Sequence, residues 1–121
     1  MSVDLTVHQL QERCRAQDVE GVLKLFAADA TVCGEGAPAI VSGEAELRET
    51  IAHMFEFTPS LTISIHQQFQ VVEDCVVTWL HWSSPSPQGE PIAFRSLTTW
   101  RKQGDAWTIV ADFYGMGRFE A

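Results

Sequence analysis

The alternation of apolar and polar residues in the last third of the chain, Pro91 to Tyr114, predicts two long β-strands. A two-residue loop at Gln103-Gly104 would join them as an antiparallel pair. The predicted cross-strand partners are Trp100 with Trp107, Thr98 with Ile109, Ser96 with Ala111, Phe94 with Phe113 and, on the other face, Arg95 with Asp112. A four-residue loop would shift the partners by two and keep the faces, whereas a three-residue bulged loop would break this register.

Apolar residues at helical spacing predict three helices before these strands. The first runs from about Asp4 to Ala16, and the second follows Asp18, whose carboxylate can accept the free amide protons of the next turn. The third begins at Ser42 or Gly43. His53 falls off the apolar stripe of this third helix, so we expect it to lie in solvent.

The middle of the chain shows the two-residue period of strands at Leu61 to Val72 and at Cys75 to Ser83, after a short β-like run at residues 30–33. Residues 84–90 contain two prolines and predict a surface loop, because proline lacks the amide donor that a central strand needs. The strand from Cys75 is bulky on both faces, although helices can cover only one side of the sheet. A second copy of the chain would cover the other face, so we expect a homodimer.

Length and charge narrow the function classes. With 121 residues the chain is long enough for one domain, residues 1–121, with a substantial core. Its 8 lysines and arginines against 16 aspartates and glutamates give a formal charge of −8, which argues against nucleic acid and anionic membranes as partners. No stretch approaches a membrane-spanning length and no basic, apolar leader begins the chain, so we expect a cytoplasmic protein.

Three segments of the chain carry a family resemblance. They are residues 18–32, where a helix leads into the first strand, Ser42-Gly43 before the third helix, and the closing hairpin at residues 100–110. These segments, in this order, resemble the nuclear transport factor 2-like superfamily, and within it the SnoaL-like and ketosteroid isomerase-like group. The resemblance implies an α+β fold, in which a cone-shaped, curved antiparallel sheet packs on about three helices. Such a cone would hold its ligand between the concave face of the sheet and the helices.

The resemblance also implies which residues line the pocket of the cone. These residues are Phe26, Thr78, Leu80, Trp82, Phe94, Ser96, Thr98, Ala111 and Phe113. The acid–base groups of the ketosteroid isomerases do not carry over, because Gly34, about Leu10 and about Thr98 stand at their positions. Glu35 is the remaining catalytic candidate, since a carboxylate in an apolar cone has a raised pKa and can shuttle a proton. We expect its loop, residues 34–38, to lie at the pocket mouth. The alternative to a catalytic role is that Glu35 is a solvated loop residue.

No other pattern in the chain points to a cofactor or a metal. The three cysteines lack C-x-x-C spacing, and the histidines and carboxylates lack the spacing of metal ligands. His66 lies on the polar side of its strand and His81 on the face assigned to the dimer. Three functions therefore stay open: a binding domain for a small hydrophobic molecule, a cofactor-free isomerase, cyclase or dehydratase acting by proton transfer, and a non-catalytic association module.

Overall fold

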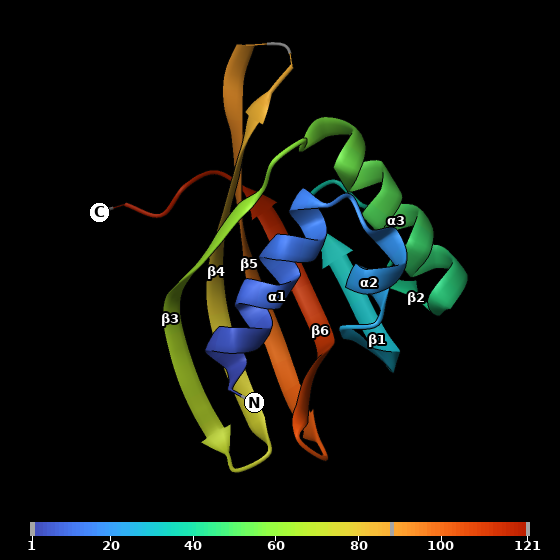
Figure 1. The fold of residues 1–121 in the computed structure, drawn as a ribbon, viewed down its shortest axis with the longest axis vertical. Coiled ribbons are helices and arrows are strands. Elements are labelled where there is room, and N and C mark those ends of the chain that lie inside the picture. Colours follow the sequence, from blue (N-terminus) through green and yellow to red (C-terminus); the bar gives the residue numbers. More distant parts are fainter. Residues whose placement is uncertain (1, 88, 121) are drawn as a thin grey trace.

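The computed structural model describes residues 2–87 and 89–120, which form one six-stranded sheet with helices against one face (Figure 1). The strand order is β2-β1-β6-β5-β4-β3. The strands are β1 (Phe26–Gly34), β2 (Val41–Ser42), β3 (Thr62–Val72), β4 (Cys75–Ser86), β5 (Gly89–Gln103) and β6 (Ala106–Met116). Neighbours are antiparallel except β1 and β6, which are parallel. The predicted α+β class is therefore confirmed, with a mixed rather than a purely antiparallel sheet.

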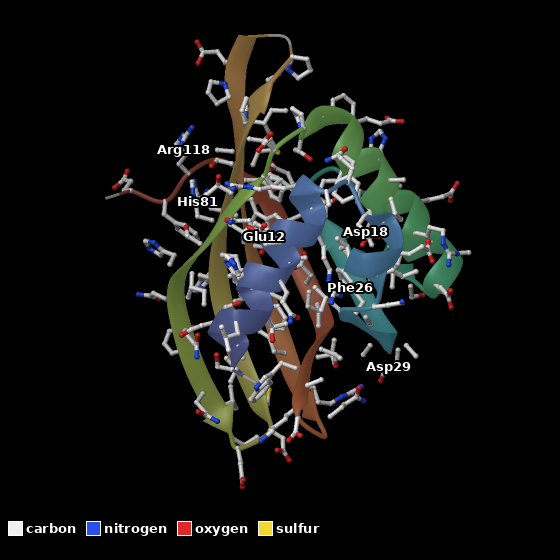
Figure 2. All side chains as sticks on the ribbon, in the orientation of Figure 1. Glu12, Asp18, Phe26, Asp29, His81 and Arg118 are labelled. Atoms are coloured by element: carbon white, nitrogen blue, oxygen red, sulfur yellow. The ribbon has the colours of Figure 1, made fainter. Side chains whose placement is uncertain are left out.

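The helices are α1 (Val3–Arg15), α2 (Val19–Leu23) and α3 (Glu44–Phe57), and each begins close to its predicted start. The predicted N-cap at Asp18 is confirmed, since its carboxylate accepts a hydrogen bond from the amide of Gly21 at 2.9 Å (Figure 2). The buried apolar residues of α1 join a core cluster that contains the fully buried Trp100 of β5. Within the described residues, no helix has the length and the apolar run needed to cross a bilayer.

The β5–β6 hairpin differs from the predicted register along its whole length. Next to the turn the partners are shifted by two with the faces kept, so Trp100 does not lie opposite Trp107, and a bulge then shifts the remaining partners by one more residue. Trp100 lies opposite Ile109, but the next pair along the ladder is Thr99 with Ala111. Val110 is therefore an extra residue in β6 with no partner in β5. A β-bulge of this kind shifts the alternation of the strand by one and so changes which side chains face the helices.

Beyond the bulge, the predicted partners and faces of β6 are wrong. Asp112 lies opposite Thr98, on the inner side of the sheet, which is the side that faces the helices. Ala111 and Phe113, both predicted inside, lie on the outer face. The predicted ion pair of Arg95 with Asp112 is also wrong, because the extra residue puts these two side chains on opposite faces of the sheet.

The turns of two hairpins also differ from prediction. The β5–β6 turn is Gly104-Asp105, one residue later than predicted, and its glycine has a φ of +64°, which glycine adopts at low cost. The predicted loop at residues 84–90 is shorter than expected, because β4 runs on to Ser86, which pairs with Gly89. Pairing of β3 with β4 ends before this segment, so Pro85 lies in a two-stranded ribbon with one side that needs no donor, and Pro87 lies in the turn that follows. Residue 88 of the predicted loop lies outside the described residues.

The outer face of the sheet carries apolar side chains that no helix covers. Phe113 and Phe69 are 55% and 52% exposed there. Elsewhere on this face, Phe119 of the C-terminal segment stacks on His66 with ring centroids 4.1 Å apart and meets the edge of Trp79 at 5.9 Å. The C-terminal segment thus covers part of the face on which a homodimer is expected. The homodimer itself stays a prediction.

Two histidines predicted to lie away from the pocket are found on this outer face. His66 is exposed and His81 is half-buried. Burial lowers the pKa of His81, and the positive charges of Arg118 and His66 act in the same direction (Figure 2). Both imidazoles are on the far side of the sheet from the helices.

Strands β1 and β6 approach each other closely at Gly34, which pairs with Tyr114. A Cβ atom at position 34 would clash with the Tyr114 ring, so the absence of a side chain on β1 lets the ring lie over the backbone. This close approach fixes where the tyrosine ring stands on the inner side of the sheet.

We predict that Gly34→Ala lowers the free energy of unfolding by about 1–3 kcal/mol, because the added methyl group overlaps the Tyr114 ring. Urea unfolding measures the change. The matched control is the same substitution in a Tyr114→Ala background, where the space above residue 34 is empty and most of the cost should disappear. An equal cost in both backgrounds would show that the ring does not impose the glycine.

Candidate functional site

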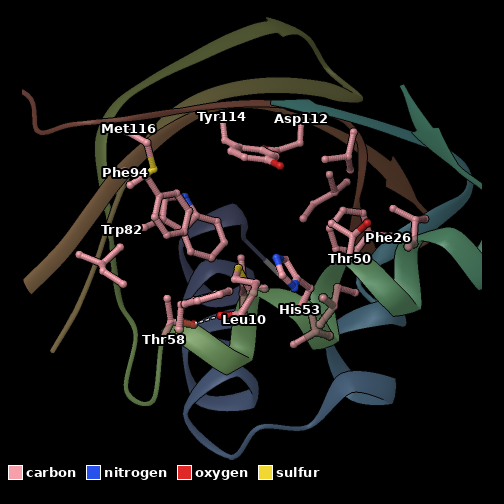
Figure 3. Close-up of a pocket in the computed structure, with 18 residues that line it drawn as sticks. Leu10, Phe26, Thr50, His53, Thr58, Trp82, Phe94, Asp112, Tyr114 and Met116 are labelled. Carbon is pink, nitrogen blue, oxygen red and sulfur yellow. Dashed lines mark hydrogen bonds between the residues drawn. The ribbon is translucent and has the colours of Figure 1, made fainter. Parts of the chain in front are cut away.

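A cavity of about 460 Å³ lies between the inner face of the sheet and the helices (Figure 3). All three helices and strands β1, β4, β5 and β6 contribute to its wall, mostly with apolar side chains. The polar residues of the wall are Thr50, His53, Thr58, Asp112 and Tyr114. A cavity of this composition attracts a ligand mainly by taking apolar surface out of water.

The structure divides the predicted pocket residues into three groups. Phe26, Trp82 and Phe94 line the cavity. Four more lie on the inner sheet face but are buried beneath the lining, namely Thr78, Leu80, Ser96 and Thr98. Ala111 and Phe113 border a separate, shallower hollow of about 170 Å³ on the outer face. Ligand binding by the first group stays a prediction, and the placement of the last pair on the cavity side is wrong because of the bulge.

Asp112 is the one acidic residue among the described residues that line the cavity (Figure 3). Burial raises the pKa of its carboxyl from 3.8 to about 6, because the charged form loses its hydration. The hydroxyls of Thr98 and Ser96 act in the opposite direction, since O–H groups that point toward a carboxylate favour its charged form. A carboxyl that titrates near pH 6 can both give and take a proton under near-neutral conditions.

A row of hydrogen bonds leads from the interior of the sheet to Asp112. The hydroxyl of Thr98 donates to Asp112 Oδ1 at 2.5 Å. The Ser96 hydroxyl lies 3.0 Å from that of Thr98, and the indole Nε1 of Trp82 donates to Ser96 Oγ at 2.9 Å. Trp82 therefore takes part in the site twice, with its ring on the cavity wall and with its N–H behind the carboxyl.

Glu35, the catalytic candidate from the sequence, lies outside the cavity lining. It is exposed, and its Oε1 accepts a hydrogen bond from the amide of Met116 at 2.7 Å. The carboxylate thus satisfies a backbone donor at the end of β6 and does not face the cone. The acidic group inside the cone is Asp112 instead.

Helix α3 contributes polar side chains to the rim of the cavity. His53 is exposed as predicted, with 72% of its side chain accessible, yet it also lines the cavity (Figure 3). Its Nδ1 lies 3.3 Å from Oε2 of Glu56, and its ring meets the edge of Phe57 at 5.2 Å. Thr50, one turn earlier on α3, lines the same rim. The cavity therefore has a second ionisable group, on the wall opposite the sheet.

Three cavity residues of β6, Asp112, Tyr114 and Met116, were not predicted from the sequence. Their two-residue spacing is that of one strand face, so the pattern itself is visible in the chain. The pattern does not reveal the bulge, because Ile109 and Asp112 are three residues apart and fall on opposite faces of a regular strand. The sequence therefore assigns this trio to the wrong side of the sheet.

We predict that Asp112→Asn stabilises the protein above pH 6 and that the gain fades toward pH 4. The carboxyl holds its proton more tightly when folded. The destabilisation caused by Asp112 is therefore absent below pH 3.8, the pKa of the carboxyl in the unfolded chain. It grows as the pH rises and is complete above about pH 6, the pKa in the folded chain. The full gain is about 3 kcal/mol.

Urea unfolding of wild type and variant near pH 4 and near pH 8 measures this gain. The control is Asp74→Asn in the exposed β3–β4 turn, which removes a carboxyl of the same type without changing the cavity. A gain from Asp112→Asn that does not depend on pH would contradict the raised pKa.

Comparison with known proteins places this fold and cavity in a family. The family model of the SnoaL-like domain matches residues 7–110. No curated protein matches the chain in sequence. A ketosteroid isomerase-like protein from Erwinia carotovora atroseptica has a TM-score of 0.76 at 18% identity, and the match covers 98% of this chain and 100% of that one.

Two further solved structures share the fold at low identity. A putative calcium/calmodulin dependent protein kinase II association domain from Xanthomonas campestris has a TM-score of 0.79 at 11% identity, covering 95% of this chain and 85% of that chain. A protein of unknown function with a cystatin-like fold from Nostoc punctiforme has a TM-score of 0.74 at 16% identity, covering 95% and 90%. These likenesses show the fold alone. Because the family model spans most of the chain, the protein belongs to the SnoaL-like domain family.

Proposed function

We propose that the protein binds a small apolar molecule in the cone cavity. The observation that carries this proposal is the cavity itself, about 460 Å³ of space with a mostly apolar wall. Trp82 and Phe94 stack with ring centroids 5.1 Å apart and present flat aromatic surface, which suits a flat ligand. The ligand gains affinity because its apolar surface leaves water, and Asp112 orients it by contacting one polar atom of the ligand.

The volume of the cavity favours ligand binding over a module whose only role is association. Protein interiors are close-packed, so an association module needs no internal space of this size. The likeness to a putative kinase association domain is one of fold at 11% identity and carries no activity to this chain. A homodimer is compatible with ligand binding, because the uncovered outer face and the cavity lie on opposite sides of the sheet.

We predict that Thr50→Trp weakens the binding of the neutral apolar probe N-phenyl-naphthylamine by about tenfold or more, a loss of roughly 1.4 kcal/mol. The indole would fill the rim of the cavity, where Thr50 is only partly buried and the core need not move. Fluorescence titration measures the affinity. The matched control is Glu49→Trp, which adds the same ring at an exposed neighbour outside the lining. Unchanged affinity in both variants would mean that the probe binds elsewhere.

A second function, cofactor-free proton transfer on the bound molecule, is favoured by Asp112. Its pKa of about 6 leaves the carboxylate available as a base and makes the carboxylic acid a competent donor. In an apolar cavity the carboxylate would take a proton from a carbon next to a ligand carbonyl and then return it. Isomerases, cyclases and dehydratases that need no cofactor use steps of this kind.

We predict that the protein accelerates the exchange of the α-protons of β-tetralone, an apolar bicyclic ketone, with solvent deuterium, and that Asp112→Asn abolishes the acceleration. The rate should rise with pH through about 6, as the carboxylate of Asp112 forms. Proton NMR in deuterium oxide measures the exchange. Glu35→Gln is the control and should keep the wild-type rate, since Glu35 lies outside the cavity. Equal rates for wild type and Asp112→Asn would leave ligand binding as the function.

A further inference from the structure

When the carboxyl of Asp112 is charged, the hydrogen bonds behind it have only one possible direction. An indole N–H can only donate, so Ser96 Oγ is the acceptor for Trp82. A carboxylate can only accept, so Thr98 gives its single proton to Asp112 Oδ1. The bond between the two hydroxyls must then run from Ser96 to Thr98, because Thr98 has no second proton to give. Every donor in this row points toward the carboxyl.

We propose that Trp82, Ser96 and Thr98 are positioning residues that hold Asp112 Oδ1 as an acceptor and confine the exchangeable proton of Asp112 to Oδ2. This inference rests on the proposed role of Asp112 as the acid–base group of the cavity. The Thr98 hydroxyl donates its hydrogen bond to Oδ1 whether the carboxyl is charged or neutral, since the carbonyl oxygen of a neutral carboxyl accepts as a carboxylate oxygen does. Oδ2 is then the oxygen that meets the ligand.

Burial keeps this row in its direction. Ser96 and Thr98 are each 1% exposed and Trp82 is 7% exposed, so water cannot replace a lost partner. Turning the Thr98 hydroxyl away would leave Asp112 Oδ1 without its donor, and reversing the whole row would take the acceptor from the buried Ser96 proton. Either loss is costly in the interior. In the described part of the chain, every buried side-chain nitrogen and oxygen has a hydrogen-bond partner.

The same sheet face offers an internal comparison. Trp100 Nε1 donates to Thr78 Oγ1 at 2.9 Å, and Thr78 donates to the backbone carbonyl of Thr98 at 3.4 Å. This second row is as buried as the first, but it ends on a carbonyl that does not titrate. Trp100 therefore makes the same kind of bond as Trp82 without a side-chain link to the carboxyl.

Other ionisable groups around the cavity must be separated from Asp112 in any titration. They are His53 of α3, with Glu56 beside it, and Tyr114 of β6. Helices α1 and α2 and strands β1, β4 and β5 add only uncharged side chains to the described wall. Because histidine changes charge near neutral pH, the titration is made both in wild type and in a His53→Gln background.

The test follows the indole N–H resonances of Trp82 and Trp100, together with the side-chain carboxyl carbon of Asp112, by NMR during a pH titration of the ligand-free protein. The Trp82 resonance should move with the same midpoint as the Asp112 carboxyl, and the Trp100 resonance should not. Ser96→Ala should abolish the Trp82 response and raise the midpoint of Asp112 by about one unit, because the carboxylate loses support. Thr78→Val, the matched control, should change neither.

Each outcome of this experiment separates the two proposals. A Trp82 resonance that ignores an Asp112 carboxyl titrating near pH 6 would overturn the positioning role and leave the acid–base proposal standing. A carboxyl that titrates at its ordinary value of 3.8 would remove the acid–base proposal itself. The wild-type titration alone decides between these results, so the test holds even where Ser96→Ala does not fold.

Discussion

Because Val110 has no partner in β5, the side chains of β6 that follow it change face. Asp112 and Tyr114 thereby face the helices, and Phe113 turns outward. In a regular strand the cone would contain Ala111 in place of the aspartate, and its wall would have no carboxyl. A backbone irregularity thus gives this cavity its acidic group, and it does so without changing any residue on the opposing strand.

Trp82 joins the proposed acid–base group to the proposed ligand surface of the cavity. Its ring stacks on Phe94 at the cavity wall, while its N–H begins the row of hydrogen bonds that ends on Asp112. A ligand that moves this ring would also move the support of the carboxyl. The carboxyl of Asp112 lowers the stability of the folded chain above pH 6, because its charged form loses hydration on folding.

The parts of the structure that were predictable from sequence are those set by nearby residues. The cap at Asp18 needs only the amide three residues ahead, and the stripe of α1 needs only helical periodicity. The cone itself followed from the family resemblance. The candidate site was not predictable in the same way, because the bulge at Val110 and the bond between Glu35 and Met116 depend on strands that meet from distant parts of the chain. Alternation alone therefore placed Asp112 on the outer face.

The close packing of Tyr114 over Gly34 has a stereochemical consequence. The tyrosine ring takes the space on β1 where the family resemblance places a catalytic carboxylate, and Asp112 stands two residues away on the same face of β6 (Figure 3). A planar molecule resting against this wall would meet the carboxyl with one of its two faces only. A proton taken and returned by a single carboxyl stays on that face, so a transfer between two carbons would be suprafacial. In deuterium oxide, the product of such a transfer would carry deuterium on one prochiral side only.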